Sequence, residues 1–216
     1  TLPNEINNTY HALFPSPQRV AFEKEFGFPL KGWQEDVEGN PQNIEKLVDV
    51  LHRDRQLNPL DDLKYVKIVP TSFFKQSLFE KVPFSFKVSG MSFAGRIFLE
   101  SLPNSNSIDA STIHHEIAHY AYDNFVSDSL AIKWPEPANP YDSPFIAYPK
   151  QFIFSEKDTL GFEEHLHETC SFVSEYSKIA FVEDMACSAE HLNMYFFTLR
   201  NFLDENPGSD FEKKAD

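Results

Sequence analysis

Residues 109–125 read DASTIHHEIAHYAYDNF, and the fold of the chain is best predicted outward from this stretch. Apolar side chains recur in it at the spacing of one helix face, at Ile113, Ile117, Tyr120, Ala121 and Phe125. This period predicts an amphipathic helix over residues 109–125. Ser107 or Asp109 can cap its N-terminus, because both side chains accept hydrogen bonds from the first free backbone N–H groups.

The same stretch contains the pattern H-E-x-x-H, from His115 to His119. Two histidines one helical turn apart share a face, so both imidazoles can bind one metal ion at about 2.0–2.1 Å. Glu116 is displaced by about 100° around the helix and stands beside that ion, where it can act as a general base. We therefore predict one Zn²⁺ per chain, with ligands His115 and His119 and base Glu116. The alternative is a helix whose two half-buried histidines only form hydrogen bonds.

A catalytic zinc ion usually has three protein ligands and one open position. The longer motif with a glycine and a third histidine fails, because Tyr122 and Phe125 occupy those positions. Glu183 and Asp184 interrupt an otherwise apolar run, and we predict that Glu183 is the third ligand. Asp184 is then expected to accept a hydrogen bond from a ligand imidazole. Alternatively, both acids only complement the dipole at the start of a helix.

The residues HHEIAHY (114–120) followed by FVSEYSKIAFVEDMACSAE (172–190) resemble the gluzincin metallopeptidases. The spacing of tyrosine and glutamate is similar to that of the anthrax lethal factor and MtfA-like branch, and to secreted bacterial zinc peptidases. The resemblance implies a zincin-like fold, the zinc ligands His115, His119 and Glu183, the base Glu116, and Tyr176 as oxyanion donor. It also implies that an edge strand near residues 92–100 pairs with an extended peptide; the alternative for this segment is an ordinary core strand. Cys187 stands where the thermolysin branch has an aspartate.

A neutral phenol beside the metal can stabilise an oxyanion without competing for the ion, which gives Tyr176 a chemical reason independent of the resemblance. The alternative for Tyr176 is an ordinary packed aromatic ring. The expected activity is that of a zinc-dependent endopeptidase that hydrolyses peptide bonds with a metal-activated water. Two alternatives stay open: a zinc-binding module without catalytic activity, and a metal-dependent amidase that acts on a non-peptide amide.

The expected fold class is α+β and zincin-like, with a small twisted mixed sheet, the active-site helix and a helical C-terminal lobe. We predict a single domain over 1–216, with an N-terminal lobe of about 1–127 and a C-terminal lobe of about 128–216. Periodicity and turn residues predict helices at 19–26, 43–57, 160–172 and 181–203, and strands at 65–69, 84–88 and 96–100. Turns are expected around Gly90 and Gly95, and the proline-rich residues 134–144 are expected to be irregular.

The charge and the apolar content of the chain argue against nucleic acid as a partner and against a membrane span. The net charge is −14, from 33 acidic and 19 basic residues, and Lys and Arg are scattered along the chain, so nucleic-acid binding is not expected. The sequence contains no run of 18 apolar residues, so a membrane span is not expected. The expected activity implies a protein or peptide substrate as the partner. The chain starts at Thr1, so we expect that a preceding segment is removed. Its acidic, cysteine-poor composition and the resemblance to secreted bacterial zinc peptidases lead us to expect a secreted or exported bacterial protein.

The remaining histidines and cysteines have simpler interpretations. His165 and His167 point about 200° apart on a helix, so they are not expected to chelate one ion. His191 follows Glu183 by two helical turns and could line the site. His114 is expected at the surface or behind the metal ligands. Cys170 and Cys187 are expected to be two buried thiols or a single bridge.

Overall fold

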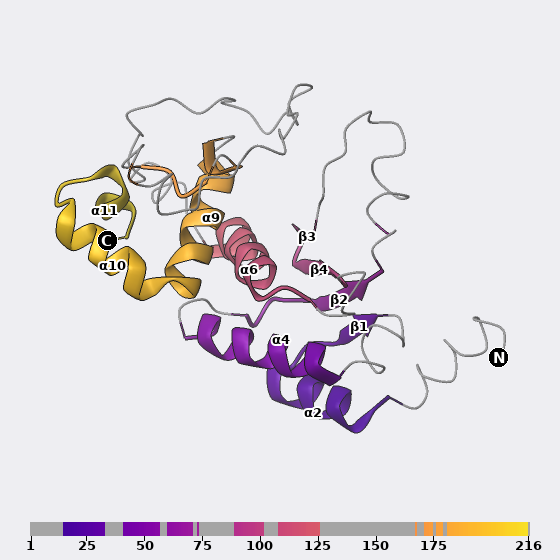
Figure 1. Cartoon of the computed structure of the whole chain (residues 1–216). Helices are drawn as coiled ribbons and strands as arrows, with labels where there is room; N and C mark the ends of the chain where they lie inside the picture. The colour runs from indigo at the N-terminus through magenta and orange to yellow at the C-terminus, as the bar shows by residue number, and fades with distance from the viewer. Residues whose placement is uncertain are drawn as a thin grey trace. The chain divides into compact units, whose positions relative to one another are not determined.

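The computed structural model describes residues 15–32, 41–56, 60–70, 73, 89–101, 108–125, 167, 171–174, 176–178 and 181–215. These residues form six α-helices, one 3₁₀ helix and a small sheet of four strands, a mixed α+β chain as predicted. The chain divides into two compact units (Figure 1). Unit 1 comprises Thr1–Pro83 and Lys87–Tyr120, and unit 2 comprises Phe84–Phe86 and Ala121–Asp216, so the division falls inside the helix that carries the H-E-x-x-H motif.

Unit 1 contains the sheet and the larger hydrophobic core. Its elements are α2 (Pro17–Phe26), β1 (Leu30–Gly32), α4 (Pro41–Asp54), β2 (Tyr65–Val69), β3 (Gly90–Phe93), β4 (Arg96–Glu100) and most of α6 (Ala110–Phe125). The strand order is β1-β2-β4-β3. The pairs β1–β2 and β2–β4 are parallel, whereas β3 runs antiparallel to β4, which confirms the predicted mixed sheet.

One face of the sheet packs into the core of unit 1. Leu30, Val66 and Ile97 are aligned across three strands and are 0–1% exposed. Ile68 and Leu99 continue the same face one step along the strands. Helices α2, α4 and α6 contribute their apolar side chains to this core cluster. The alternation of buried and partly exposed residues in YVKIV and RIFLE follows from this one-sided packing.

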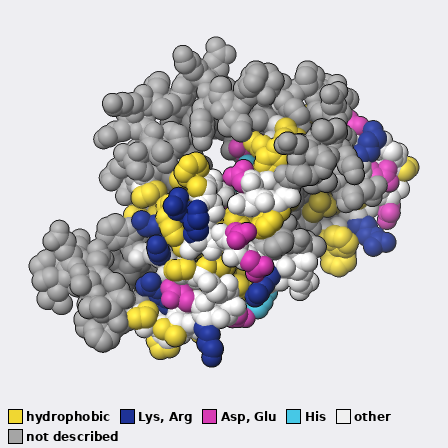
Figure 2. All heavy atoms as spheres, turned by 180° about the vertical axis from the view of Figure 1, so that it is seen from behind, with side chains coloured by type: hydrophobic (Ala, Val, Ile, Leu, Met, Phe, Trp, Pro, Cys, Tyr) yellow, Lys and Arg dark blue, Asp and Glu magenta, His cyan; other side chains and the backbone are white. Residues whose placement is uncertain are grey.

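The opposite face of the sheet combines basic and aromatic side chains. Lys31 and Arg96 both lie over the ring of Tyr65, with 3.9 and 5.8 Å to its centroid. Lys67 pairs with Lys31 across the strands, and Phe98 packs edge-on against Tyr65. The basic residues are thus less scattered than we expected, because strand register unites positions that are far apart in the sequence. Basic, acidic and apolar side chains are interspersed over the face of the molecule shown in Figure 2.

Helix α4 fixes the start of α6 within unit 1. The amide of Ile108 donates to Asn43 Oδ1 over 2.8 Å, and Lys46 Nζ donates to the Ile108 carbonyl over 2.8 Å. Asp109 then caps α6, since its carboxylate accepts from the amide and the hydroxyl of Ser111. The predicted cap at Asp109 is therefore confirmed, whereas Ser107 lies outside the described residues.

Unit 2 is helical in its described part. It contains the end of α6, η1 (Tyr176–Lys178), α9 (Phe181–Met194), α10 (Phe196–Glu205) and α11 (Asp210–Ala215). The prediction of one helix over 181–203 was wrong, because Tyr195 leaves the helical conformation with φ −129° and ψ 33°. The break redirects α10 so that Leu199 and Phe202 join a core cluster with Phe211. No helix in the described ranges has the length and apolar character needed to cross a bilayer.

Other local predictions have mixed outcomes. Strands 65–69 and 96–100 are β2 and β4, and helices 19–26 and 43–57 correspond to α2 and α4. A turn forms at Gly95, with φ 73°, but Gly90 begins strand β3 rather than a turn. The segments 84–88 and 134–144 lie outside the described residues. Of the predicted helix 160–172, His167 is helical and residues 171–172 are not.

Candidate metal centre

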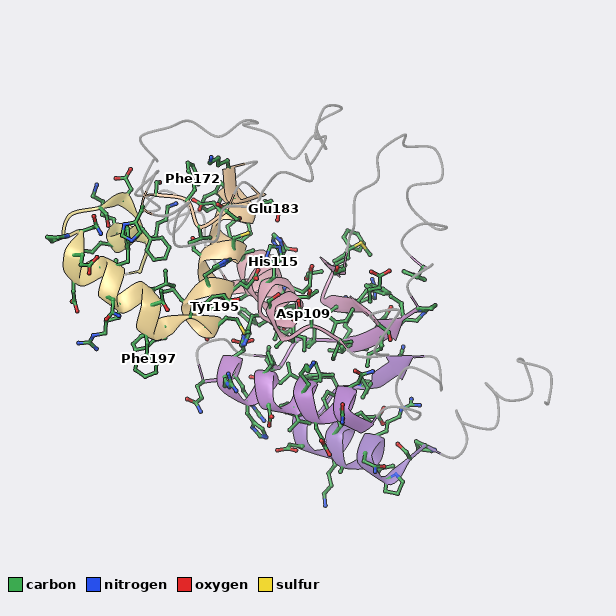
Figure 3. The ribbon with its side chains drawn as sticks, viewed as in Figure 1. Asp109, His115, Phe172, Glu183, Tyr195 and Phe197 are labelled. Atoms are coloured by element: carbon green, nitrogen blue, oxygen red, sulfur yellow. The ribbon has the colours of Figure 1, made fainter. Side chains whose placement is uncertain are left out.

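Helix α6 separates its core residues from its two motif histidines. Ile113, Ile117 and Tyr120 are each 1% exposed and belong to the core cluster of unit 1. His115 is two residues from both isoleucines and therefore points about 200° away from them. His115 and His119 are half-buried. The imidazole of His115 lies on the side of α6 opposite the core of unit 1 (Figure 3).

The two imidazoles face each other. Their Nε2 atoms are 3.1 Å apart, and the ring centroids are 4.7 Å apart. Two nitrogen ligands at 2.0–2.1 Å from one tetrahedral ion would be separated by about 3.3 Å. The observed separation therefore fits two ligands of one zinc ion. It also fits an N–H···N hydrogen bond between two neutral rings, which is the alternative stated above.

Glu116 projects from α6 toward the sheet of unit 1. The residue is 5% exposed, and its Cγ and Oε1 lie close against Gly90 at the start of β3. Thr112, one turn earlier on the same face, contacts the same glycine. Glu116 is thus buried against β3, and its role as a general base stays a prediction.

His114 is not at the surface, and that part of the expectation was wrong. Its side chain is 0% exposed, and Nδ1 lies 3.0 and 2.9 Å from the two carboxylate oxygens of Asp54. Asp54 ends helix α4 and is itself 1% exposed. The pair anchors α6 to α4, so the histidine that directly precedes the motif holds the helix in place.

We expect Asp54→Ala to lower the free energy of unfolding by about 1–3 kcal/mol. The change leaves the buried His114 without its carboxylate partner, and an unsatisfied buried polar group costs about that much. Chemical denaturation followed by circular dichroism measures the loss.

Glu25→Ala is the matched control. Glu25 of α2 forms a histidine–carboxylate pair with His52 of α4 over 2.8 Å, and both side chains are largely exposed. An exposed pair contributes about 0–1 kcal/mol. Equal losses in the two variants would contradict an anchoring role for Asp54.

Glu183 and Asp184 lie in the first turn of α9, in unit 2. Glu183 is half-buried. Asp184 is 0% exposed, and its two oxygens accept from Lys214 Nζ over 2.9 and 2.7 Å. Lys214 also donates to the carbonyl of Ser171 over 2.7 Å. Burial lowers the pKa of Lys214, and the charge of Asp184 opposes that effect. The carboxylate of Asp184 thus binds an ammonium, and its hydrogen bond to a ligand imidazole stays a prediction.

The structure describes some of the remaining predicted residues and not others. Tyr176 begins the 3₁₀ helix η1. His191 Nδ1 donates to the carbonyl of Cys187 on its own helix over 2.8 Å. His167 packs against Phe202 and is the one residue described within 164–168. Cys187 is 4% exposed, and Cys170 lies outside the described residues, so a bridge between them is not tested.

Two groups of side chains among the described residues could hold a metal ion. One consists of His115, His119 and Glu183, and the other of His115, Cys187 and Glu190. Cys187 and Glu190 did not emerge as candidates from the sequence, since a Cys-x-x-Glu spacing is not distinctive.

Strand β4 is not an edge strand and cannot pair with a substrate peptide. It pairs with β2 on one side and with β3 on the other, so its main-chain groups are already engaged. The expectation of an edge strand over residues 92–100 was therefore wrong for β4. In the described part of the sheet, β3 is the last strand on that side.

Comparisons with known proteins were made at three levels. No protein-family model matches the chain, and no characterised protein and no solved structure matches it either. The features that bear on function are therefore those of the chain itself: one helix of an α+β fold presents two facing imidazoles and a buried glutamate.

Proposed function

We propose that the protein is a zinc-dependent endopeptidase of the zincin type. His115, His119 and Glu183 would hold the ion, Glu116 would act as base, and Tyr176 would donate to the oxyanion. The observation that carries the proposal is the pair of Nε2 atoms 3.1 Å apart on α6, next to a buried glutamate. Two imidazoles and a carboxylate are donors typical of catalytic zinc.

Zinc bound there supplies a Lewis acid for the scissile carbonyl and lowers the pKa of water to about 7. Glu116 accepts the proton of the attacking water and later returns it to the leaving amine. The phenol of Tyr176 donates a hydrogen bond to the oxygen on which negative charge develops. An extended peptide would pair with β3, since main-chain pairing with an end strand holds a substrate in register.

Contacts within unit 2 support Glu183 as the third ligand. The ring of Tyr122, near the end of α6, packs edge-on against Phe181 with centroids 5.5 Å apart. Phe181 is the first residue of α9, and Glu183 follows two residues later. The contact therefore packs the first turn of α9 against the last turn of α6 within unit 2.

Metal content tests the proposal. The purified wild-type protein, after equilibration with zinc and removal of the excess, should contain about one zinc per chain. His115→Ala and Glu183→Ala should each lose the metal, because each removes one of three ligands. His52→Ala is the matched control, since His52 is an exposed histidine paired with Glu25.

If His115, Cys187 and Glu190 hold the ion instead, a different pair of variants loses the zinc. If zinc persists in Glu183→Ala and disappears in the double variant Cys187→Ser/Glu190→Ala, the proposed ligand set is wrong. A wild-type protein that binds no zinc would overturn the proposal altogether. Cleavage of a peptide library then separates an endopeptidase from an amidase, because an amidase for non-peptide amides leaves linear peptides intact.

A further inference from the structure

The start of strand β3 has no room for a side chain. A Cβ atom added to Gly90 would lie 2.6 Å from Glu116 Cγ, 2.6 Å from Glu116 Oε1 and 2.7 Å from Thr112 Cγ2. Each distance is well inside van der Waals contact. The backbone of Gly90 does not lie in the left-handed region, unlike that of Gly95 with φ 73°. Glycine is therefore required at this position by space and not by backbone conformation.

The space beside Gly90 is filled by one face of α6. Thr112 and Glu116 are four residues apart, so both side chains lie on the face that meets β3. Glu116 is 5% exposed, and Gly90 is held in place by its pairing with Leu99 of β4. The carboxylate of Glu116 is thus seated against bare main chain. A larger residue at position 90 can be accommodated only if the Glu116 side chain moves or if strand and helix separate.

We propose that Gly90 is a positioning residue that sets the location of the Glu116 carboxylate. The inference rests on the proposed function, in which Glu116 is the base. Proton transfer requires the carboxylate within about 2.6–3.2 Å of the attacking water. A misplacement of about 1 Å can lower the rate by about 10²-fold. An alanine at position 90 would force a displacement of this kind while the zinc ligands stay in place.

The first measurement is steady-state kinetics of Gly90→Ala with its zinc content. We expect kcat to fall by about 10²-fold, with KM nearly unchanged and zinc still bound. Thr112→Ser/Gly90→Ala should be as slow as Gly90→Ala, because removing the Thr112 methyl group leaves the clash with Glu116. Gly95→Ala is the matched control: it strains the same hairpin, with φ 73° and a Cβ 3.3 Å from the carbonyl of Asp62, away from Glu116. It should keep the wild-type kcat.

The second measurement does not depend on activity. Gly90→Ala should lower Tm by roughly 2–10 °C, as overpacking does. In the background Thr112→Ser/Glu116→Ala, which vacates the space, the same substitution should lower Tm by much less. An equal loss in both backgrounds, or an unchanged kcat in Gly90→Ala, would overturn the inference.

The activity of Glu116→Gln, measured beside that of Gly90→Ala, separates this inference from the proposed function. Full activity of Glu116→Gln would end the role of Glu116 as base, and with it the positioning role of Gly90. An inactive Glu116→Gln beside a fully active Gly90→Ala would leave the proposed function standing and reject the role of Gly90 alone.

Discussion

Glu116→Gln is expected to lower kcat by about 10²–10⁴-fold, the contribution that a positioned general base typically makes. Glutamine has nearly the same volume as glutamate, so it fills the space against Gly90 without a new clash. It cannot accept the proton of the attacking water. Both imidazoles that we propose as zinc ligands remain, so the zinc content should stay at the wild-type value. Cleavage of casein or of a peptide library, measured beside the wild-type protein, gives the ratio.

Glu45→Gln provides the control for this experiment. Glu45 is an exposed glutamate on α4, outside the proposed site, and its substitution should leave kcat unchanged. Equal activity of the wild-type protein and Glu116→Gln would exclude the proposed chemistry. Zinc binding without any cleavage by the wild-type protein would favour the alternative of a catalytically silent zinc-binding module.

The parts of the fold that the sequence predicts well are those specified by local periodicity. The helix over 109–125 was expected from apolar residues one turn apart, and α6 runs from Ala110 to Phe125. β2 and β4 were expected from alternation, because one face of the sheet is buried and the other is not. The two imidazoles that meet on α6 follow from the same local geometry, since a spacing of four residues is enough to align them.

The parts that failed depend on partners far away in the sequence. Gly90 was interpreted as a turn residue, but its lack of a side chain serves the contact with Glu116, 26 positions further on. His114 was expected at the surface or behind the metal ligands, and its partner Asp54 could not be inferred because it lies 60 residues earlier. β1 is three residues long and becomes a strand only by pairing with β2. No window of local sequence contains these pairings.

The same limit applies to the third ligand. An isolated pair of acids at the start of a helix has two explanations, a metal ligand and a favourable interaction with the helix dipole. Both Glu183 and Asp184 do lie in the first turn of α9. The sequence could not show that Asp184 binds a lysine 30 residues later. That ion pair gives one of the two acids a structural role, so the case for zinc ligation rests on Glu183.

Lys214→Ala is expected to lower the free energy of unfolding of unit 2 by about 3–5 kcal/mol, the cost of removing one partner from a buried ion pair. Lys214 and Asp184 both have 0% exposed side chains. Without the ammonium, the carboxylate of Asp184 stays buried without this counter-charge, and α11 loses its bond to the Ser171 carbonyl. Urea denaturation followed by fluorescence and circular dichroism measures the loss.

Lys213→Ala is the matched control, because Lys213 is the neighbouring lysine on α11 and its pair with Asp210 is exposed. Its loss should be about 0–1 kcal/mol. The double variant Lys214→Ala/Asp184→Asn separates burial of the charge from simple packing. Asparagine has nearly the volume of aspartate but no charge, so the double variant no longer buries an uncompensated carboxylate and should be more stable than Lys214→Ala. If Lys214→Ala and Lys213→Ala lose the same stability, the pair of Lys214 and Asp184 does not hold α11 on α9. If the double variant loses the sum of the two single effects, burial of the Asp184 charge does not cause the instability of Lys214→Ala.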